Sequence, residues 1–191
     1  MLRPLGLAPA GALIAGANGA LAGWRGIYDW RRARGWAAAV LDSSWGLVGT
    51  AAGLGLHVLS RSTRDPGYVD DLSRRANRFV YARGWTPRPR FAFTAGNVVT
   101  GAGDATNARR RQLVERHEDL HVWQHRWFGP LYPLAYGAWM AGGALAGTVA
   151  WMRGERTWFR AVERRAYYLN PFERWAYAAD GVDSRTRGLP A

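Results

Sequence analysis

The feature that most constrains the fold is a run of 22 residues without a charged side chain, Leu131–Met152. A helix of that length is long enough to span a lipid bilayer. Gly142 and Gly143 stand at its centre, so the run is equally compatible with a short helical hairpin, a helix lying in the membrane interface or a buried helix. The run therefore fixes where a helical segment lies and leaves its environment open.

Two further apolar stretches precede it, residues 5–23 and residues 37–59. The first carries Ala and Gly at four-residue spacing, which lets helix backbones approach closely in a membrane. It is also compatible with a signal peptide or a soluble helix. The second contains Asp42 and several glycines and predicts a helix, or a short helix followed by a glycine-rich strand. Residues 24–36 mix arginines with aromatic side chains, which is typical of a membrane-interface belt or of a cap on a soluble helical pair.

The chain carries a formal net charge of +12, and its 26 basic residues are all arginine. Such a charge favours anionic partners. We expect membrane lipids and no nucleic acid, because no nucleic-acid-binding motif is visible. Since the chain has no cysteine, disulfides and thiolate metal sites are excluded, and a metal must be held by His, Asp or Glu. The composition is typical of a high-G+C bacterial genome, and arginines flank the apolar runs. We therefore predict a location at the bacterial cytoplasmic membrane, with the side left open.

The middle and C-terminal parts show clearer periodicity. Residues 68–83 have helical spacing and end at Gly84, whereas residues 91–100 predict one strand or two short strands. A helix capped by Thr106 or Asn107 should run to Phe128, and two more are predicted at 156–168 and 171–179. We therefore expect a predominantly helical α+β fold with an apolar N-terminal part (1–60, membrane-associated), a main domain (61–180) that carries an apolar insertion (131–152), and a polar tail (181–191).

The strongest functional signal is the segment His117-Glu118-Asp119-Leu120-His121, an HExxH pattern on the predicted helix ending at Phe128. Residues four apart share one helix face, so both imidazoles can bind one zinc ion, and Glu118 is displaced to the side, where it can take a proton from water. The bland alternative is a helix with two unrelated histidines. A catalytic zinc site needs a third protein ligand.

Three residues can supply that third ligand: Glu173, Glu163 and His125. We favour Glu173 among them. Its alternative role is helix capping, because Asn170 at the N-cap, Pro171 at the first helical position and Glu173 two residues later form a capping box. His125 lies one turn beyond His121 on the same rigid helix, which makes tetrahedral closure around one ion difficult.

These motifs, in this order, resemble the catalytic core of minimal gluzincin-type metallopeptidase domains of bacteria. The matching residues are Gly84, Ala92-Phe93-Thr94, Gly96-Asn97, His117-Glu118, His121, Gln124 and the later Asn170-Pro171-Phe172-Glu173 with Ala176. The resemblance covers roughly residues 68–180 and implies a zincin-like core of a helix, an edge strand or short β-hairpin, the HExxH helix and a glutamate helix. The chain departs from that pattern with Asp119 after Glu118 and with Tyr177 one turn after Glu173.

The resemblance also implies roles for individual residues. Zinc is bound by His117, His121 and Glu173, with Glu118 as the catalytic base, and an extended peptide or protein substrate pairs with the edge strand. The residues implied in that strand are Phe93, Thr94, Gly96, Asn97 and Val98. From the residues themselves, Tyr167, Tyr168, Tyr177 and the arginines near Arg164 are candidates for oxyanion stabilisation. Gln124 and Asp180 are candidates for supporting the ligands.

Three hypotheses remain open from the sequence: an active zinc peptidase, a non-catalytic zinc-binding module acting at a membrane or a partner, and a structural membrane protein without metal. The zinc hypotheses carry a condition on topology. If Leu131–Met152 crossed a membrane once, the HExxH helix and Glu173 would lie on opposite sides. A shared, water-exposed zinc therefore predicts that this segment returns as a hairpin, lies in the interface or is a buried helix.

Overall fold

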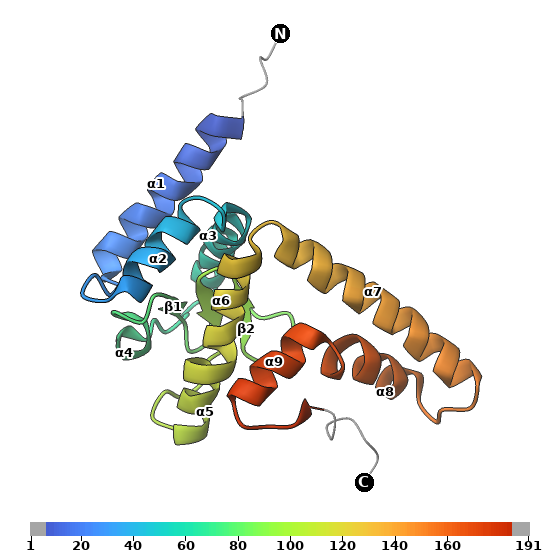
Figure 1. Cartoon of the computed structure of the whole chain (residues 1–191). Coiled ribbons are helices and arrows are strands. Elements are labelled where there is room, and N and C mark those ends of the chain that lie inside the picture. The colour runs from blue at the N-terminus through green and yellow to red at the C-terminus, as the bar shows by residue number, and fades with distance from the viewer. Residues whose placement is uncertain (1–6, 185–191) are drawn as a thin grey trace. The chain divides into compact units, whose positions relative to one another are not determined.

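The computed structural model describes residues 7–184, and the chain divides into two compact units, Met1–Pro130 (unit 1) and Leu131–Ala191 (unit 2). The described residues are predominantly helical with a small sheet, so the predicted α+β class with a helical majority is confirmed (Figure 1). Among residues 7–184, no helix combines the length and the apolar character needed to cross a membrane. The predicted tail at 181–191 lies mostly outside the described residues.

Unit 1 begins with three helices that pack on one another: α1 (Leu7–Arg25), α2 (Ala33–Asp42) and α3 (Leu47–Arg61). The predicted helix in the first apolar stretch is α1. The second stretch forms two helices rather than a helix and a glycine-rich strand. Ser44 and Gly46 make the break between α2 and α3, where both backbone N–H groups donate to the carbonyl of Leu41.

The helix predicted over residues 68–83 is wrong. Only α4 (Asp70–Ser73) is helical, and the chain then turns through Arg75 and Asn77, both at positive φ, into strand β1 (Phe79–Val80). Tertiary pairing outweighs the local pattern here, because β1 lies beside β3 (Val98–Thr100) and buries Phe79 and Val80 completely. Aromatic and β-branched side chains favour such a buried sheet position.

Residues 91–100 form two short strands, as one of the two sequence alternatives predicts. Strand β2 (Phe93–Ala95) pairs antiparallel with β3, and β3 pairs parallel with β1, so the strand order is β1-β3-β2 and β2 lies at an edge. The turn between β2 and β3 lies against α3. Gly96 has φ +56°, and a Cβ there would lie 2.0 Å from the carbonyl oxygen of Gly49, so glycine is required for this approach.

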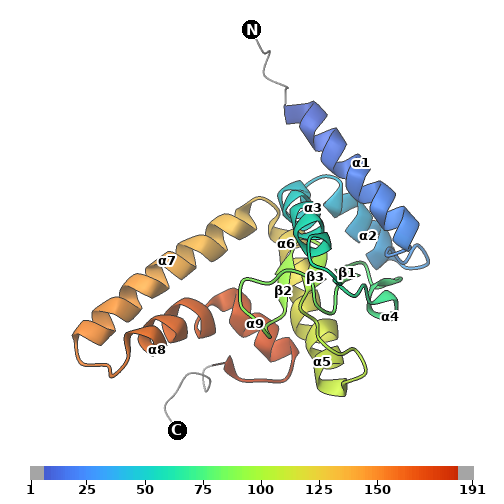
Figure 2. The same ribbon diagram turned by 180° about the vertical axis from the view of Figure 1, so that it is seen from behind.

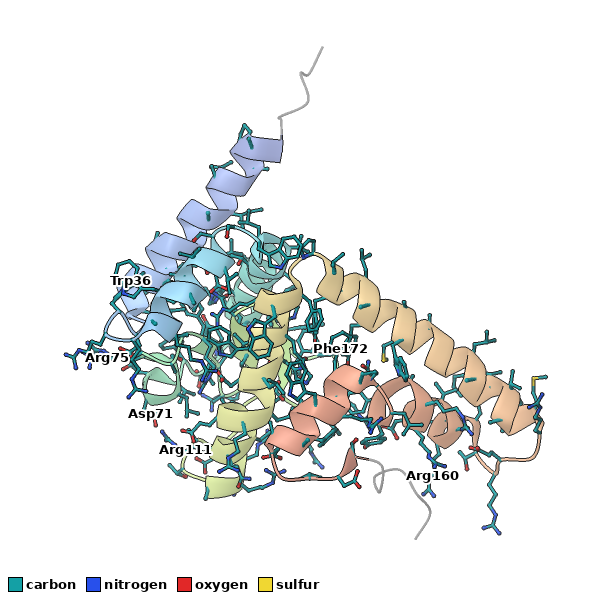
Figure 3. All side chains as sticks on the ribbon, in the orientation of Figure 1. Trp36, Asp71, Arg75, Arg111, Arg160 and Phe172 are labelled. Atoms are coloured by element: carbon teal, nitrogen blue, oxygen red, sulfur yellow. The ribbon has the colours of Figure 1, made fainter. Side chains whose placement is uncertain are left out.

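The HExxH segment lies on a long helical run made of α5 (Ala108–Gln112), a π-helical turn η1 (Leu113–Glu118) and α6 (Asp119–Phe128). The side chain of Asn107 caps the start by accepting a hydrogen bond from the N–H of Arg110, and Gly129 at positive φ ends the run, both as predicted. An ion pair between Arg111 on α5 and Asp71 on α4 ties the run to the rest of unit 1 (Figure 3).

Unit 2 is a helical hairpin followed by a short helix. Its elements are α7 (Leu131–Met152), α8 (Trp158–Glu163), a π-helical turn η2 (Arg164–Tyr168) and α9 (Pro171–Ala179). Helix α7 runs beside α8 and η2, as the view from behind also shows (Figure 2).

The hairpin predicted at Gly142 and Gly143 does not form, because α7 continues through both residues. Nor is α7 a buried helix, since only Tyr132 and Gly147 on it are buried. The glycines serve helix packing instead. A Cβ at Gly143 would lie 2.6 Å from the Cα of Ala166, and one at Gly147 would lie 2.5 Å from the Cα of Val162. The small residues thus let η2 and α8 lie directly on α7.

Candidate metal centre

The two histidines of the HExxH segment lie together in unit 1. His117 lies in the π-helical turn η1 and His121 lies one turn later on α6; both are buried. Their Nε2 atoms are 3.2 Å apart, with the rings at 77° to each other. Two nitrogens bound to one tetrahedral zinc at ~2.0–2.1 Å would lie about 3.3 Å apart. The pair therefore has the spacing that a shared metal ion requires, and π-helical turns of this kind are frequent at functional sites.

Gln124 fixes the orientation of His121. Its Oε1 lies 2.8 Å from Nδ1 of His121, and the residue is completely buried. An amide oxygen only accepts hydrogen bonds, so Nδ1 of His121 carries the proton and Nε2 is left with its lone pair. That lone pair points toward Nε2 of His117. The tautomer with its proton on Nδ1 is the one that leaves Nε2 able to bind a metal.

Glu118 is buried beside this pair and held by the sheet. The hydroxyl of Thr94 on β2 donates to Oε2 of Glu118 at 2.7 Å. This contact joins two segments that the sequence separates by 24 residues, the edge strand and the HExxH helix. The side chain of the predicted base is therefore positioned from the strand predicted to hold substrate.

Glu173 lies in the first turn of α9 in unit 2 and is also buried. The predicted N-cap is Asn170, whose side chain accepts from the N–H of Phe172. The reciprocal bond of a capping box is missing, because the N–H of Asn170 donates to the carbonyl of Tyr167. The Glu173 carboxylate instead accepts a hydrogen bond from the hydroxyl of Tyr136 on α7, at 2.8 Å.

The two alternative third ligands lie on α6 (His125) and α8 (Glu163). His125 packs against α3, where a Cβ added at Gly49 would lie 3.1 Å from its Nδ1. Burial, with His121 and Arg126 nearby, lowers the pKa of His125 to about 3. Glu163 is the last residue of α8 and is half-buried.

The remaining candidates for oxyanion stabilisation and ligand support lie in unit 2, whereas Gln124 lies on α6 of unit 1. The ring of Tyr177 contacts those of Tyr167 and Tyr168 at centroid distances of 6.4 and 6.2 Å. Asp180 is the buried C-cap of α9. Arg164 begins η2 and is half-buried. The arginines near it were also candidates for oxyanion stabilisation.

The predicted substrate strand divides between edge and core. Phe93 and Thr94 lie on the half-buried edge strand β2. Val98 lies on the central strand β3, where its backbone pairs on both sides, and Asn97 is a buried hydrogen-bond donor to Asn18 and Asp42. Gly96 is required for packing on α3. Of the five residues, Phe93 and Thr94 therefore lie on the edge strand.

Sequence reasoning missed a buried ion pair in unit 1. Arg126 on α6 donates from Nε and Nη2 to the two carboxylate oxygens of Asp42 on α2, each at 2.8 Å, and both side chains are almost fully buried. The hydroxyl of Tyr28 and the amide of Asn97 also donate to Asp42. We name this group the Asp42 cluster. Its sequence signal was a lone carboxylate inside an apolar run.

The Asp42 cluster shifts two pKa values. Burial raises the pKa of Tyr28, and the nearby negative charge of Asp42 raises it further. Burial lowers the pKa of Arg126, but the attraction of Asp42 outweighs burial, and the net direction is upward. The cluster thus holds one fixed ion pair that joins α2 to the HExxH helix.

Asp119 has a structural role. Its carboxylate accepts from Arg78 through Oδ1 and from Arg34 through Oδ2, at 2.5 and 2.9 Å. These contacts tie the start of α6 to the segment before β1 and to α2. They account for an acidic residue at the position after Glu118.

No protein-family model matches this sequence, and no curated protein or solved structure matches it either. The resemblance to gluzincins therefore stays a prediction that rests on the motifs and on the geometry described above.

Proposed function

We propose that His117, His121 and Glu173 hold one zinc ion in a zincin-like core and that the chain is a zinc-dependent peptidase with Glu118 as general base. The observation that carries the proposal is the 3.2 Å separation of the two histidine Nε2 atoms. That separation also fits an N–H···N hydrogen bond between the rings, so the metal content of the protein is the deciding measurement.

Glu173 is the preferred third ligand because of its chemistry and surroundings. It is a buried carboxylate, and we infer that it joins His117 and His121 as the third ligand. The hydroxyl of Tyr136 binds Oε1, which orients the carboxylate. Two imidazoles and one carboxylate form a ligand set typical of catalytic zinc sites in hydrolases.

The groups around the centre can divide the tasks of amide hydrolysis among them. When bound, zinc supplies a Lewis acid and lowers the pKa of a coordinated water to about 7. Glu118 accepts the proton of the attacking water and later delivers it to the leaving amine. Thr94 holds the Glu118 carboxylate in position through Oε2.

The edge strand β2 suits an extended peptide substrate. It pairs with β3 through one side, and among the described residues no strand pairs with its other side. A polypeptide added at that side would form main-chain hydrogen bonds with residues 93–95. Since Thr94 contacts Glu118, such a substrate would run next to the base.

The test is metal content and peptide hydrolysis of the purified full-length chain. We expect one zinc per chain by elemental analysis and cleavage of denatured casein and of a mixed fluorogenic peptide library. His121→Ala and Glu173→Gln should lose zinc. Glu118→Gln should keep zinc and lower kcat/KM by about 10²–10⁴-fold, the usual contribution of a general base.

His57→Gln is the matched control, since His57 is also buried but its Nδ1 pairs with the hydroxyl of Tyr81. It should keep both zinc and activity. Stoichiometric zinc without any cleavage, unchanged by Glu118→Gln, would identify a non-catalytic zinc module instead. A folded protein without bound metal after zinc reconstitution would overturn the proposal.

A further inference from the structure

The end of the α7–α8 hairpin in unit 2 is an exposed mixture of aromatic and basic side chains. We call residues Trp151–Arg160 the hairpin tip. Four large apolar side chains on it are exposed to solvent, at 45% for Trp151, 70% for Met152, 48% for Trp158 and 55% for Phe159. Apolar side chains gathered in so short a segment are unusual on a surface that contacts only water.

The basic side chains of the tip carry uncompensated charge. Arg153, Arg156 and Arg160 are exposed, and no ion pair binds them within the described part of the chain. Figure 3 shows Arg160 on the outer side of α8. The one carboxylate of the tip, Glu155, is bound by both terminal nitrogens of Arg165 on η2. The tip therefore presents three positive charges among its apolar side chains.

The other segment rich in tryptophan and arginine, residues 24–36 of unit 1, differs in this respect. The guanidinium of Arg25 stacks on Trp24 and Tyr68, and Arg34 pairs with Asp119. The ring of Trp30 packs edge-on against that of Trp36, which is also labelled in Figure 3. Arg25 and Arg34 thus have partners within unit 1, whereas the three arginines of the tip make no ion pair among the described residues.

The tip is also built to hold its shape. Gly143 and Gly147 allow α8 and η2 to lie directly on α7, and the indole N–H of Trp158 donates to the hydroxyl of Thr148 at 3.1 Å. The aromatic side chains are thus presented from a packed hairpin rather than from a long loop. A preformed surface loses little conformational entropy when it binds.

We propose that the hairpin tip docks on an anionic lipid surface. Guanidinium groups bind phosphate oxygens bidentately, and tryptophan prefers the boundary between headgroups and acyl chains. The tip supplies both chemistries side by side, together with Met152 and Phe159 to enter the acyl region. A second copy of this chain is a poorer occupant, because the three arginines would face three more arginines.

Vesicle co-sedimentation of the full chain tests the docking. We expect binding to vesicles of phosphatidylcholine with about 30% phosphatidylglycerol and weak binding to phosphatidylcholine alone, since anionic lipid attracts the basic tip. Each basic residue near an anionic surface contributes roughly fivefold to binding. The triple variant Arg153→Gln, Arg156→Gln, Arg160→Gln should therefore bind these vesicles about 100-fold more weakly. Added salt should weaken vesicle binding by the wild type and should hardly change vesicle binding by the variant.

A matched control removes the same charge from unit 1, at Arg31, Arg64 and Arg90, each replaced by Gln. All three are exposed. We expect this variant to bind like the wild type within a fewfold. Equal losses in the two triple variants would show that net charge alone drives binding and would overturn the assignment to the tip.

A site-specific probe locates the contact. Because the chain has no cysteine, Thr157→Cys places a single thiol in the tip, and Ala108→Cys places one on exposed α5. Thr157 makes no side-chain capping bond, so the substitution costs little. An environment-sensitive dye on the tip thiol should shift to the blue on anionic vesicles, whereas the same dye on the α5 thiol should not. A shift at neither site, or self-association of the chain blocked by Trp151→Ala and Phe159→Ala, would overturn the proposal.

Discussion

Two buried polar groups lie on the same helical run of unit 1, and they differ in how their charges are satisfied. In the Asp42 cluster, a full positive and a full negative charge cancel through two hydrogen bonds of 2.8 Å. In the histidine pair, two nitrogens of the same kind face each other at 3.2 Å beside a carboxylate held by Thr94. The first arrangement joins α2 to α6, while the second suits a cation. Burial of polar side chains is therefore common to a group that joins two helices and to the group proposed to bind a metal, and the two groups differ in the atoms that face each other.

The largest effect should come from breaking the Asp42 cluster. Arg126→Leu leaves the Asp42 carboxylate buried without its counter-charge, which should lower the free energy of unfolding by about 3–5 kcal/mol. Urea denaturation of the metal-free protein measures it. Replacing Asp42 by Leu as well should recover much of the loss. Arg83→Leu, which breaks an exposed pair with Asp65, should cost at most about 1 kcal/mol. Equal costs for the two arginines would remove the contrast between buried and exposed pairs.

A smaller effect on the free energy of unfolding should come from His57, a buried histidine whose Nδ1 pairs with the hydroxyl of Tyr81. Burial, with Arg25 and Arg61 nearby, lowers its pKa to about 4, whereas the unfolded chain has about 6.5. Between these values the unfolded state binds the proton more readily, so the free energy of unfolding falls as the pH drops from 6.5 to 4. The loss is of order 3 kcal/mol.

His57→Gln should remove this dependence, because glutamine can keep a hydrogen bond to Tyr81 and does not titrate. The measurement is the difference in unfolding free energy between wild type and variant at about pH 7.5 and about pH 4.5, on either side of the unfolded-state pKa. If this difference were the same at both pH values, the pKa of His57 would not be lowered by burial and the prediction would be wrong.

The smallest effect should come from the support of His121. Gln124→Leu removes the acceptor at Nδ1 and should weaken zinc binding by about 10–100-fold, with little change in urea stability of the metal-free protein. Competition with a chelator measures the affinity. Gln124→Glu keeps an acceptor and should bind zinc nearly as well as the wild type. If Gln124→Leu lowered the folding stability but not the zinc affinity, Gln124 would stabilise the fold, as Asp42 does, and would not support a zinc ligand.

Local patterns alone predicted several elements correctly, because the signals act over a few residues. Asn107 caps its helix and Gly129 ends the same run, and Asn170 with Pro171 starts α9 where expected. The helical spacing of His117 and His121 put both imidazoles on one face. Each of these depends on backbone geometry within one or two turns.

Other features were decided by contacts between distant segments. Residues 68–83 have the spacing of a helix, yet pairing of Phe79 and Val80 with β3 places a strand there. Gly142 and Gly143 are typical of a turn, yet close packing of Gly143 against Ala166 keeps this stretch inside α7. Asp42 in the sequence is a charge that weakens an apolar helix, and only the fold brings it to Arg126, 84 residues away.

By itself, the sequence determined which side chains are available for chemistry: four histidines, five glutamates, no cysteine, and one HExxH pattern among them. The tertiary structure decided what each of these does. It brought Thr94 into hydrogen-bond contact with Glu118 and Gln124 into hydrogen-bond contact with His121. It also paired His57 with the hydroxyl of Tyr81. The physical reason is that a side chain's role depends on the atoms that surround it, and those atoms come from segments whose pairing no local pattern specifies.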